Sequence, residues 1–225
     1  MPDDAGAGTA DESADILDAV FAISCRSLPV DHAHALSQAV QAALPWFAQE
    51  PGAGLHAIHG AASGSGWMRP EEPEALLQLS RRAKLVLRLP RRRMQDASAL
   101  LGRTLDVAGS ALRIDAVTER PLSRIGTLFS RCVVLDCADD EAAFLAAAGA
   151  GLAALGVRPE RMLCGRVTPV ATPEQIHLAR SLMVAGLATD QSLVLQKDGL
   201  GSGRIIGCGL FIPHKDIADL RSRAD

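Results

Sequence analysis

The sequence contains no tyrosine, and aromatic residues make up only 3% of its 225 residues. Proteins that bind single-stranded nucleic acid without sequence preference stack the bases on aromatic side chains. The composition therefore argues against a stacking platform of that kind. No apolar run reaches the roughly 18 residues that a membrane helix needs, and the first residues are acidic, unlike a secretory signal. We expect a cytoplasmic protein without a membrane partner.

Sequence patterns for metal and cofactor binding are also missing. The sequence contains no His-Glu-x-x-His or Asp-rich metal motif and no Gly-Lys-Ser/Thr tripeptide of a Walker loop. An odd number of cysteines without a Cys-x-x-Cys pair argues against a disulfide framework or a zinc ribbon, so reduced thiols are expected. The five cysteines are Cys25, Cys132, Cys137, Cys164 and Cys208. The sequence predicts neither a metal site nor a cofactor.

Lysine is scarce, and the charges are unevenly distributed. The net charge is −3, but residues 1–18 hold six acidic side chains and no basic one. The rest of the chain has 20 acidic and 23 basic side chains, and only three of the basic residues are lysines. Arginine binds phosphate bidentately and stacks on bases, which favours a nucleic-acid partner; a genome of high GC content would favour Arg codons as well. Residues 1–14 are predicted to be a disordered acidic tail.

Basic residues gather in two places that could contact RNA. Residues 81–93 contain seven basic side chains and no acidic one. A strand or helix with such a run can follow the phosphates of an RNA stem, or it can simply face solvent. From this run the candidates are Arg91, Arg92 and Arg93. The candidates from the second half of the chain are Arg161, Arg166, Arg180 and Arg204.

The stretch from Gln196 to Lys215 is rich in glycine, and two basic residues, Lys197 and Arg204, lie within it. Glycine permits positive φ and close approach of a second backbone, and oriented backbone amides can bind an anion. A strand follows these glycines rather than preceding them, which does not fit a dinucleotide-binding loop. The alternative is a glycine-rich turn between a helix and a strand. The candidate ligand-binding positions are Lys197, Gly199, Gly201, Gly203, Arg204, Gly207 and Gly209.

Hydrophobic periodicity predicts the same order of elements twice. The first half has predicted strands at 16–24, 54–59, 84–89 and 112–117 and helices at 32–47, 74–82 and 91–101, with Asp31 as the N-cap of the first helix. The second half has predicted strands at 127–135, 162–167, 177–187 and 210–212 and helices at 139–155 and 189–198. Two β-α-β-β-α-β units make an α+β protein of two tandem ferredoxin-like domains. We place these domains at 15–120 and 126–215, with a linker near 119–125.

Two histidines lie in the first turn of the first predicted helix, His32 and His34. Histidine is the side chain best suited to proton transfer near neutral pH. The positive end of a helix disfavours the imidazolium form, which leaves a neutral ring ready to accept a proton. Residues at i and i+2 point to different faces, so the two rings are not expected to act as a pair. Each could instead be a capping or surface residue.

Three separate patches of sequence resemble one protein family. These patches are Leu28-Pro29-Val30-Asp31-His32, Leu44-Pro45-Trp46 with Gly52-Ala53-Gly54-Leu55-His56, and the Gly-Leu-Gly and Gly-Cys-Gly-Leu-Phe segments of residues 199–211. Together they resemble the CRISPR-associated repeat-processing endoribonucleases of the repeat-associated mysterious protein superfamily, in the subgroup of myxobacterial type. This family has two tandem ferredoxin-like domains and commonly uses a histidine at the start of its first helix. His32 matches the Asp-His pattern, whereas His34 departs from it, and the chain has no tyrosine for any role that the family gives to that residue.

The resemblance implies a metal-independent endoribonuclease that cleaves CRISPR repeat RNA to mature crRNA. In this family the 2′-hydroxyl attacks the neighbouring phosphate and leaves a 2′,3′-cyclic phosphate and a 5′-hydroxyl. The implied partner is the repeat RNA hairpin, and subunits of a CRISPR effector complex are further candidates. Two alternatives stay open. One is a non-catalytic RNA-binding subunit of an effector complex; the other is a ferredoxin-like regulatory protein that binds a nucleotide.

Overall fold

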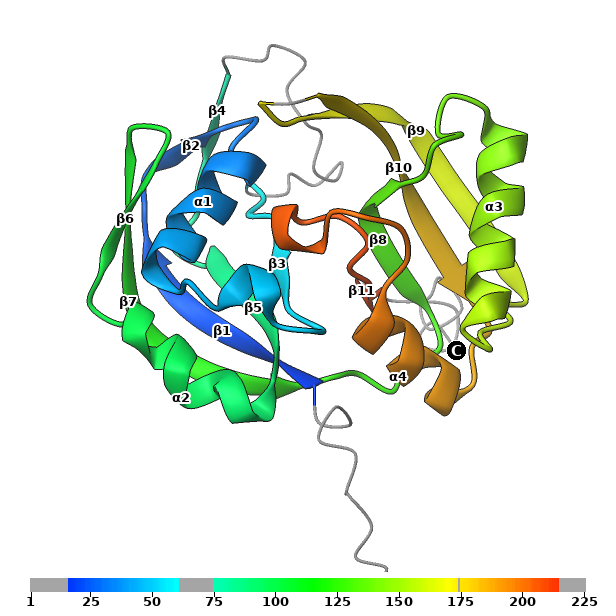
Figure 1. The fold of residues 1–225 in the computed structure, drawn as a ribbon, viewed down its shortest axis with the longest axis horizontal. Coiled ribbons are helices and arrows are strands. Elements are labelled where there is room, and N and C mark those ends of the chain that lie inside the picture. Colours follow the sequence, from blue (N-terminus) through cyan, green and yellow to red (C-terminus); the bar gives the residue numbers. More distant parts are fainter. Residues whose placement is uncertain (1–15, 61–74, 174, 215–225) are drawn as a thin grey trace, which may run out of the picture.

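A computed structural model describes residues 16–60, 75–173 and 175–214 (Figure 1). The predicted tail at 1–14 and Lys215 lie outside the described residues. The described chain forms a mixed α and β structure with two large antiparallel sheets, one from each half of the sequence, and a third sheet of two strands. No helix in the described part of the chain is long and apolar enough to cross a membrane.

The first half forms a five-stranded antiparallel sheet in the order β3-β5-β1-β7-β6. Its strands are β1 (Ile16–Ser24), β3 (Gly54–His56), β5 (Lys84–Pro90), β6 (Thr104–Val107) and β7 (Ser110–Pro121). Its helices are α1 (Ala33–Ala43) and the short α2 (Met94–Ala97), which continues the 3-10 turn η3 (Arg91–Arg93) and is followed by η4 (Ser98–Leu100). Alternate residues of β1, among them Phe21, pack into a core with Leu36 and Val40 of α1. The other face of β1 carries Asp18, whose partner Arg88 on β5 reaches the second half.

The second half forms a four-stranded antiparallel sheet in the order β11-β8-β10-β9. Its strands are β8 (Leu128–Val134), β9 (Arg161–Ala171), β10 (Ile176–Ala185) and β11 (Ile212–Pro213), and its helices are α3 (Glu141–Ala154) and α4 (Thr189–Asp198). Phe144 and Leu152 of α3 and Leu195 of α4 are buried in its core. The Asp140 side chain caps α3 by accepting hydrogen bonds from the amides of residues 142 and 143.

The predicted helix at 74–82 is wrong. Residues Leu76–Gln78 form strand β4, which pairs with β2 (Ser27–Pro29) in a two-stranded sheet. Leu28 lies opposite Leu77 in this pairing, and both side chains are buried. A short apolar segment fits a helix turn or a strand equally well, so a partner distant in sequence decides its structure.

Strand β6 was not predicted from the sequence. It forms a hairpin with β7 through a turn in which the Gly109 amide donates to the Asp106 carboxylate. Ala108 in this turn has a positive φ of 49°, which is uncommon for a residue other than glycine. Strand β7 is longer than predicted and includes residues 119–121 of the expected linker. The predicted helix at 91–101 is helical but is divided into η3, α2 and η4.

Candidate functional site

His32 begins α1 and is buried, with 3% of its surface exposed. Its Nδ1 donates a hydrogen bond to the carbonyl oxygen of Pro29 at 2.8 Å. A neutral imidazole that donates through Nδ1 carries its lone pair on Nε2. The prediction that Asp31 caps α1 is wrong: the N-cap is His32, and no side chain caps this helix. The strand β2 and its pairing with β4 thus fix the ring through the Pro29 carbonyl.

A cavity of about 330 Å³ lies between the two halves of the chain, and His32 lines it. Much of its wall is apolar and includes Val86, Phe129 and Leu210. Its charged and imidazole side chains are Asp31, His32, His56, His59, Arg120 and Arg131. Imidazoles can transfer protons near neutral pH, and guanidinium groups bind phosphate. The cavity therefore combines, in one partly apolar space, the groups that a phosphate-transfer reaction requires.

The carboxylate of Asp18 on β1 lies next to three groups near this cavity: the guanidinium groups of Arg88 and Arg120 and the imidazole of His56. This carboxylate accepts hydrogen bonds from Arg88 Nε and Arg120 Nη2, both at 2.9 Å. His56 Nε2 lies 3.6 Å from Asp18 Oδ1, which is too long for a hydrogen bond. Burial alone would raise the pKa of Asp18, but His56 and Arg88 together hold that pKa well below its ordinary value. Asp18 is therefore a permanent anion at neutral pH.

His56 is a neutral imidazole in this network. Burial lowers the pKa of His56 below its ordinary value of 6.5, and the attraction of Asp18 offsets only part of that effect. Arg88 and Arg120 lower the pKa further, because they repel a protonated ring. Protonation of the His56 ring is therefore less favourable than protonation of an exposed histidine.

His34 lies in a different place from His32, as their spacing predicted. It lines a second hollow between α1 and the glycine-rich segment, together with Ser37, Gln41 and residues 201–206. Its Nε2 is buried and has no hydrogen-bond partner among the described residues. The structure therefore brings the glycine-rich segment close to both histidines but separates the two rings.

The glycine-rich segment from 199 to 209 owes three of its glycines to close contact between backbones. A Cβ on Gly199, Gly201 or Gly209 would collide with a carbonyl oxygen, that of Gly209, Val134 or Leu200 respectively. All three have positive φ. At these three positions, glycine lets the backbone of the segment pack closely against itself and against β8. Such packing is expected of a glycine-rich turn, the alternative interpretation of this stretch.

Gly207 serves contact between the two halves. A Cβ at Gly207 would meet Ala57 at the end of β3, at 3.2 Å from both its Cβ and its amide nitrogen. The 3-10 turn η5 (Arg204–Ile206) precedes it and contacts both β3 and α1. In Figure 1 this turn, drawn in orange-red, lies between α1 and β8. The segment therefore closes one wall of the cavity.

Two arginines cross the boundary between the halves in opposite directions. Arg88 of β5 donates through Nη1 to the carbonyl oxygens of Gln196 at 2.7 Å and Phe211 at 3.0 Å. Arg204 of η5 donates through Nη2 to the carbonyl oxygen of Gly52 at 3.0 Å and through Nε to that of Ala53 at 3.3 Å. We call this reciprocal pair of contacts the arginine clasp.

Arg204 is also engaged inside its own half. Its guanidinium donates to the carbonyl oxygens of Lys197 and Asp198 at the end of α4. Burial, and then repulsion by Arg88, lower the pKa of Arg204 to about 10. Its donors are therefore directed at the protein backbone rather than at a ligand, and Lys197 contributes its carbonyl to the same arrangement.

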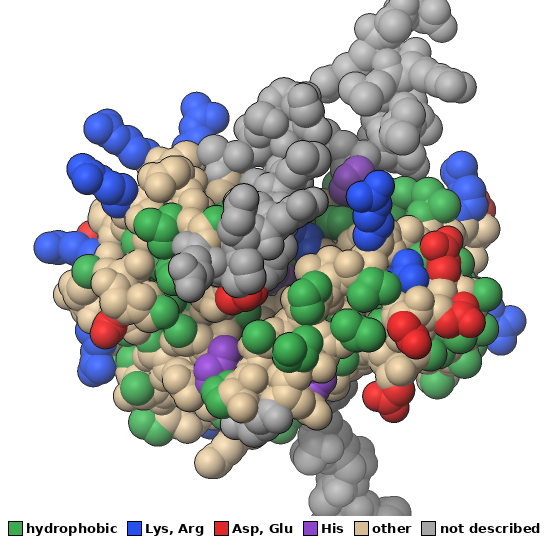
Figure 2. Space-filling model, turned by 90° about the horizontal axis from the view of Figure 1, so that it is seen from above, with side chains coloured by type: hydrophobic (Ala, Val, Ile, Leu, Met, Phe, Trp, Pro, Cys, Tyr) green, Lys and Arg blue, Asp and Glu red, His purple; other side chains and the backbone are tan. Residues whose placement is uncertain are grey.

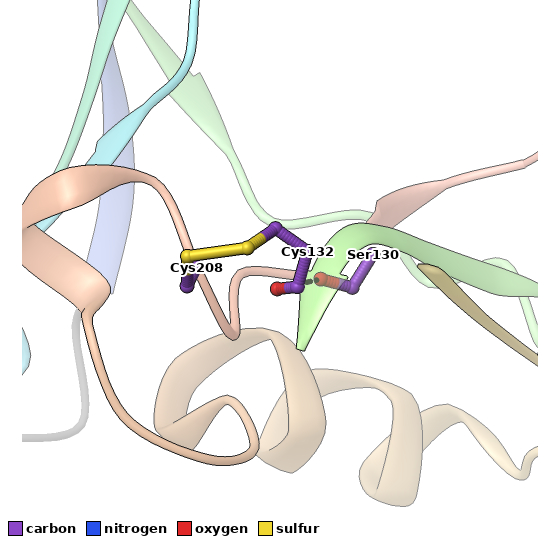
Figure 3. The surroundings of a disulfide bond; sticks show 3 residues. All are labelled: Ser130, Cys132 and Cys208. Carbon is purple, nitrogen blue, oxygen red and sulfur yellow. Dashed lines mark hydrogen bonds between the residues drawn. A yellow bond between two sulfur atoms is a disulfide. The ribbon is translucent and has the colours of Figure 1, made fainter. Parts of the chain in front are cut away.

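Cys132 of β8 and Cys208 form a disulfide bond, which contradicts the expectation that all five thiols are reduced (Figure 3). The pairing follows from the fold, because the amide of Gly209 donates to the carbonyl oxygen of Cys132 at 2.6 Å. Figure 3 also shows the Ser130 hydroxyl donating to that carbonyl. The two cysteines are 76 positions apart in the sequence, so this proximity could not be predicted from it.

The predicted RNA-binding arginines have unequal surroundings. Arg91 pairs with Glu119, and Arg92 and Arg93 both pair with the buried Glu50. The guanidinium of Arg180 is directed inwards, where it donates to the carbonyl oxygens of residues 138, 139 and 165. Arg161 and Arg166 on β9 are exposed. The acidic partners of residues 91–93 are distant in sequence. A run without acids therefore did not indicate that these arginines form ion pairs.

Six residues of the site were not predicted from the sequence as site residues: Asp18, His56, His59, Arg88, Arg120 and Arg131. His56 ends the Gly54-Leu55-His56 patch, which contributed to the family resemblance but suggested no role for this side chain. A charged residue inside an apolar strand, as Asp18 is in β1 and Arg88 in β5, was the signal that could have found the buried network. The strand register places Asp18 opposite Arg88.

Comparisons with known proteins agree with the predicted resemblance. The family model described as "Cas6 Crispr" matches residues 17–216. The chain is 31% identical over 206 residues to the "CRISPR-associated endonuclease Cas6" of Myxococcus xanthus (strain DK1622), covering 92% of this chain and 85% of that protein.

Solved structures resemble the fold at low sequence identity. A structure titled "CRISPR associated protein Cas6" has a TM-score of 0.58 at 10% identity and covers 89% of this chain and all of its own. A Cas6-related protein from Pyrococcus furiosus has a TM-score of 0.57 at 11% identity and covers 89% of this chain and 99% of its own. At this identity the likeness concerns the fold alone, and it extends over both halves of the chain.

Proposed function

The chain belongs to the Cas6 family, and on that basis we propose that it is an endoribonuclease that cleaves CRISPR repeat RNA to mature crRNA without a metal ion. One observation carries the catalytic part of this proposal. Nδ1 of His32 donates to Pro29, so the lone pair of the neutral ring is on Nε2, in a residue that lines the cavity with Arg120 and Arg131. That is the arrangement of a general base beside a phosphate site.

In the proposed reaction His32 Nε2 takes the proton of a ribose 2′-hydroxyl. The 2′-oxygen forms a bond to the adjacent phosphorus, and the bond from phosphorus to the 5′-oxygen of the next nucleotide breaks. A proton from solvent water goes to that departing oxygen, which gives a 2′,3′-cyclic phosphate and a 5′-hydroxyl. Arg120 and Arg131 would stabilise the extra negative charge of the transition state, since fixed cations in a partly apolar site act strongly there.

We also infer that each half is a ferredoxin-like domain. The second half has the order of elements β8-α3-β9-β10-α4-β11, and its sheet has the order β11-β8-β10-β9. In the first half, β1, β3, β5 and β7 with α1 and α2 repeat this order, and β6 and the β2–β4 pair are additions. The inferred boundary follows Pro121, where β7 ends.

The RNA partner would reach the cavity past exposed basic residues. On β9, the exposed Arg166 lies at the register shift between Cys164 and Val167, two residues from Thr168, which lines the cavity. Arg166 is therefore the best supported of the RNA-binding residues predicted from the sequence. The interaction with subunits of an effector complex stays a prediction.

Cleavage of the matching repeat RNA tests the proposal. His32→Ala should slow cleavage roughly 10²–10⁴-fold and leave RNA affinity nearly unchanged, because a neutral imidazole adds little to phosphate binding. His34→Ala is the matched control two residues away, and it should cost less. Cleavage should persist in EDTA, and a substrate with a 2′-deoxyribose before the cut should resist it.

The outcomes separate the alternatives. If His34→Ala is the more damaging change, the base is assigned to the wrong histidine but the reaction stands. Cleavage of the deoxy substrate, or loss of cleavage in EDTA, would refute the mechanism. A wild-type chain that binds the hairpin without cutting it would be the non-catalytic RNA-binding subunit instead.

A further inference from the structure

One end of the first sheet carries basic side chains that form no ion pair with any described acid. We call this set the outer basic cluster; it consists of Arg26, Arg81, Arg82, Lys84 and Arg103. All five residues are exposed. The cluster contrasts with residues 91–93 at the opposite end of β5, where each arginine has an acidic partner.

Strand register brings these five residues together from separate segments. Lys84 lies opposite Ala22, near the end of β1, and Ser24 at that end lies opposite Arg113. The carbonyl of Arg103 accepts a hydrogen bond from the amide of residue 114, next to Arg113. The carbonyl of Arg26 accepts one from residue 79, just before the turn that holds Arg81 and Arg82. Figure 2 shows Lys and Arg side chains projecting from this edge of the molecule, the side of β6 and β7.

The described acidic groups near the cluster have other partners. Asp115 accepts hydrogen bonds from Arg113 Nε at 3.0 Å and from the Ser24 hydroxyl at 2.8 Å. Asp106 accepts a hydrogen bond from the amide of Gly109 in the β6–β7 turn. Among the described residues, no carboxylate therefore forms an ion pair with the outer basic cluster.

The cluster is continuous with the cavity. Lys84 and Val86 lie on the same face of β5 because their side chains alternate with the buried Leu85, and Val86 lines the cavity. On the other side, the turn with Arg81 and Arg82 follows β4, whose Leu77 also lines the cavity. An RNA whose cleaved phosphate lies in the cavity would therefore contact the outer basic cluster where the chain emerges from the cavity.

We infer that the outer basic cluster binds the phosphate backbone of the double-stranded stem of the substrate RNA. The inference rests on the proposed function and names the surface that the substrate would use. The cluster contains long cationic side chains and no aromatic residue, which suits phosphate contacts and does not suit base stacking. Protein recognition of double-stranded RNA relies mostly on its shape and backbone.

The test compares two pairs of substitutions that remove equal charge. The first pair is Arg81→Gln and Arg82→Gln in one chain. The control pair is Arg124→Gln and Arg158→Gln, which are exposed positions away from the cluster. Affinity for a repeat RNA hairpin is measured by fluorescence anisotropy over a range of salt concentrations, with His32→Ala in both chains to prevent cleavage.

The cluster variant should bind the hairpin at least tenfold more weakly than the control variant. Its plot of log affinity against log salt should be shallower by about 0.9 for each phosphate that the variant no longer neutralises, if the stem behaves like duplex DNA. A hairpin with a scrambled stem sequence should show the same loss of affinity, and an unpaired strand a smaller one. Equal losses for the two variants, or an unchanged salt slope, would overturn the inference.

The same assay distinguishes failure of the inference from failure of the proposed function. If the unsubstituted chain cleaves the repeat RNA while the cluster variant binds like the control, only the assignment of the stem surface is wrong. If the unsubstituted chain neither binds nor cleaves the RNA, the proposed function and the inference fall together. A thermal melt of both variants checks that each is folded; the exposed positions make this the expected result.

Discussion

Replacing Arg88 with methionine tests whether the buried arginine clasp holds the two halves together. The side chain of Arg88 is 1% exposed and makes two hydrogen bonds to the Asp18 carboxylate and two to carbonyl oxygens of the second half. Methionine fills a similar volume but donates no hydrogen bond. The substitution leaves the Asp18 carboxylate buried with less compensation and leaves the carbonyls of Gln196 and Phe211 without this donor.

The expected loss of stability follows from these contacts. Removal of one partner from a buried ion pair costs about 3–5 kcal/mol, chiefly because the remaining charge is left uncompensated. Arg120 provides a control on the same carboxylate. It also donates to Asp18, but its side chain is 54% exposed, and exposed pairs contribute about 0–1 kcal/mol. Arg88→Met should therefore be several-fold more costly than Arg120→Met.

Urea denaturation followed by circular dichroism measures both losses. Adding Asp18→Asn to Arg88→Met removes the uncompensated carboxylate, so the double variant should be more stable than Arg88→Met alone. The reasoning is refuted if Arg88→Met costs no more than Arg120→Met, or if Asp18→Asn worsens the Arg88 variant. Either result would mean that water or Arg120 compensates Asp18 without help from Arg88.

Three further predictions concern the surroundings of the cavity. Gly209→Ala should destabilise the chain by roughly 1–3 kcal/mol more than Gly109→Ala, since both glycines have positive φ but only the first would collide with backbone; equal losses in urea denaturation would disprove the collision. Reducing the disulfide should lower the free energy of unfolding by roughly 2–4 kcal/mol, and Cys208→Ser should abolish the response to reductant; an unchanged response would show that another thiol pair is involved. The lowered pKa of His56 means that folding disfavours its protonation, so stability should fall as pH drops below 6.5; His56→Gln should flatten that fall, and an unchanged pH profile would contradict the assignment.

The elements with strong local signals in composition and capping could be predicted from sequence. The largely apolar residues 16–24 form β1 with the predicted bounds, and the Ala-rich α3 and the helix α4 lie where predicted. The elements that depend on a distant partner could not. Leu76–Gln78 is a strand only because β2 lies beside it, and β6 exists only as half of a hairpin. In both cases tertiary pairing outweighs local preference.

The candidate site divides in the same way. Position at a helix start identified His32, and its two-residue spacing from His34 correctly separated the two rings. The partners of a charge, by contrast, are not visible in the local sequence. Residues 91–93 resembled a free basic patch because Glu50 and Glu119 are distant along the chain. Residues 81, 82 and 84 in the same run have no such partners among the described acids, and only the structure tells the two groups apart.

The glycine-rich segment joins the two halves of the chain, and the arginine clasp is part of this joint. Arg204 donates to backbone carbonyls of Gly52 and Ala53, and Arg88 to those of Gln196 and Phe211. Because every one of these acceptors across the boundary is a main-chain oxygen, the residues that provide them are not fixed by side-chain chemistry. The two guanidinium groups and the glycines that let backbones approach closely cannot be replaced without loss of these contacts. The family pattern of glycines near the end of the chain can therefore record the joint between the halves, and RNA contact at the cavity would depend on that joint.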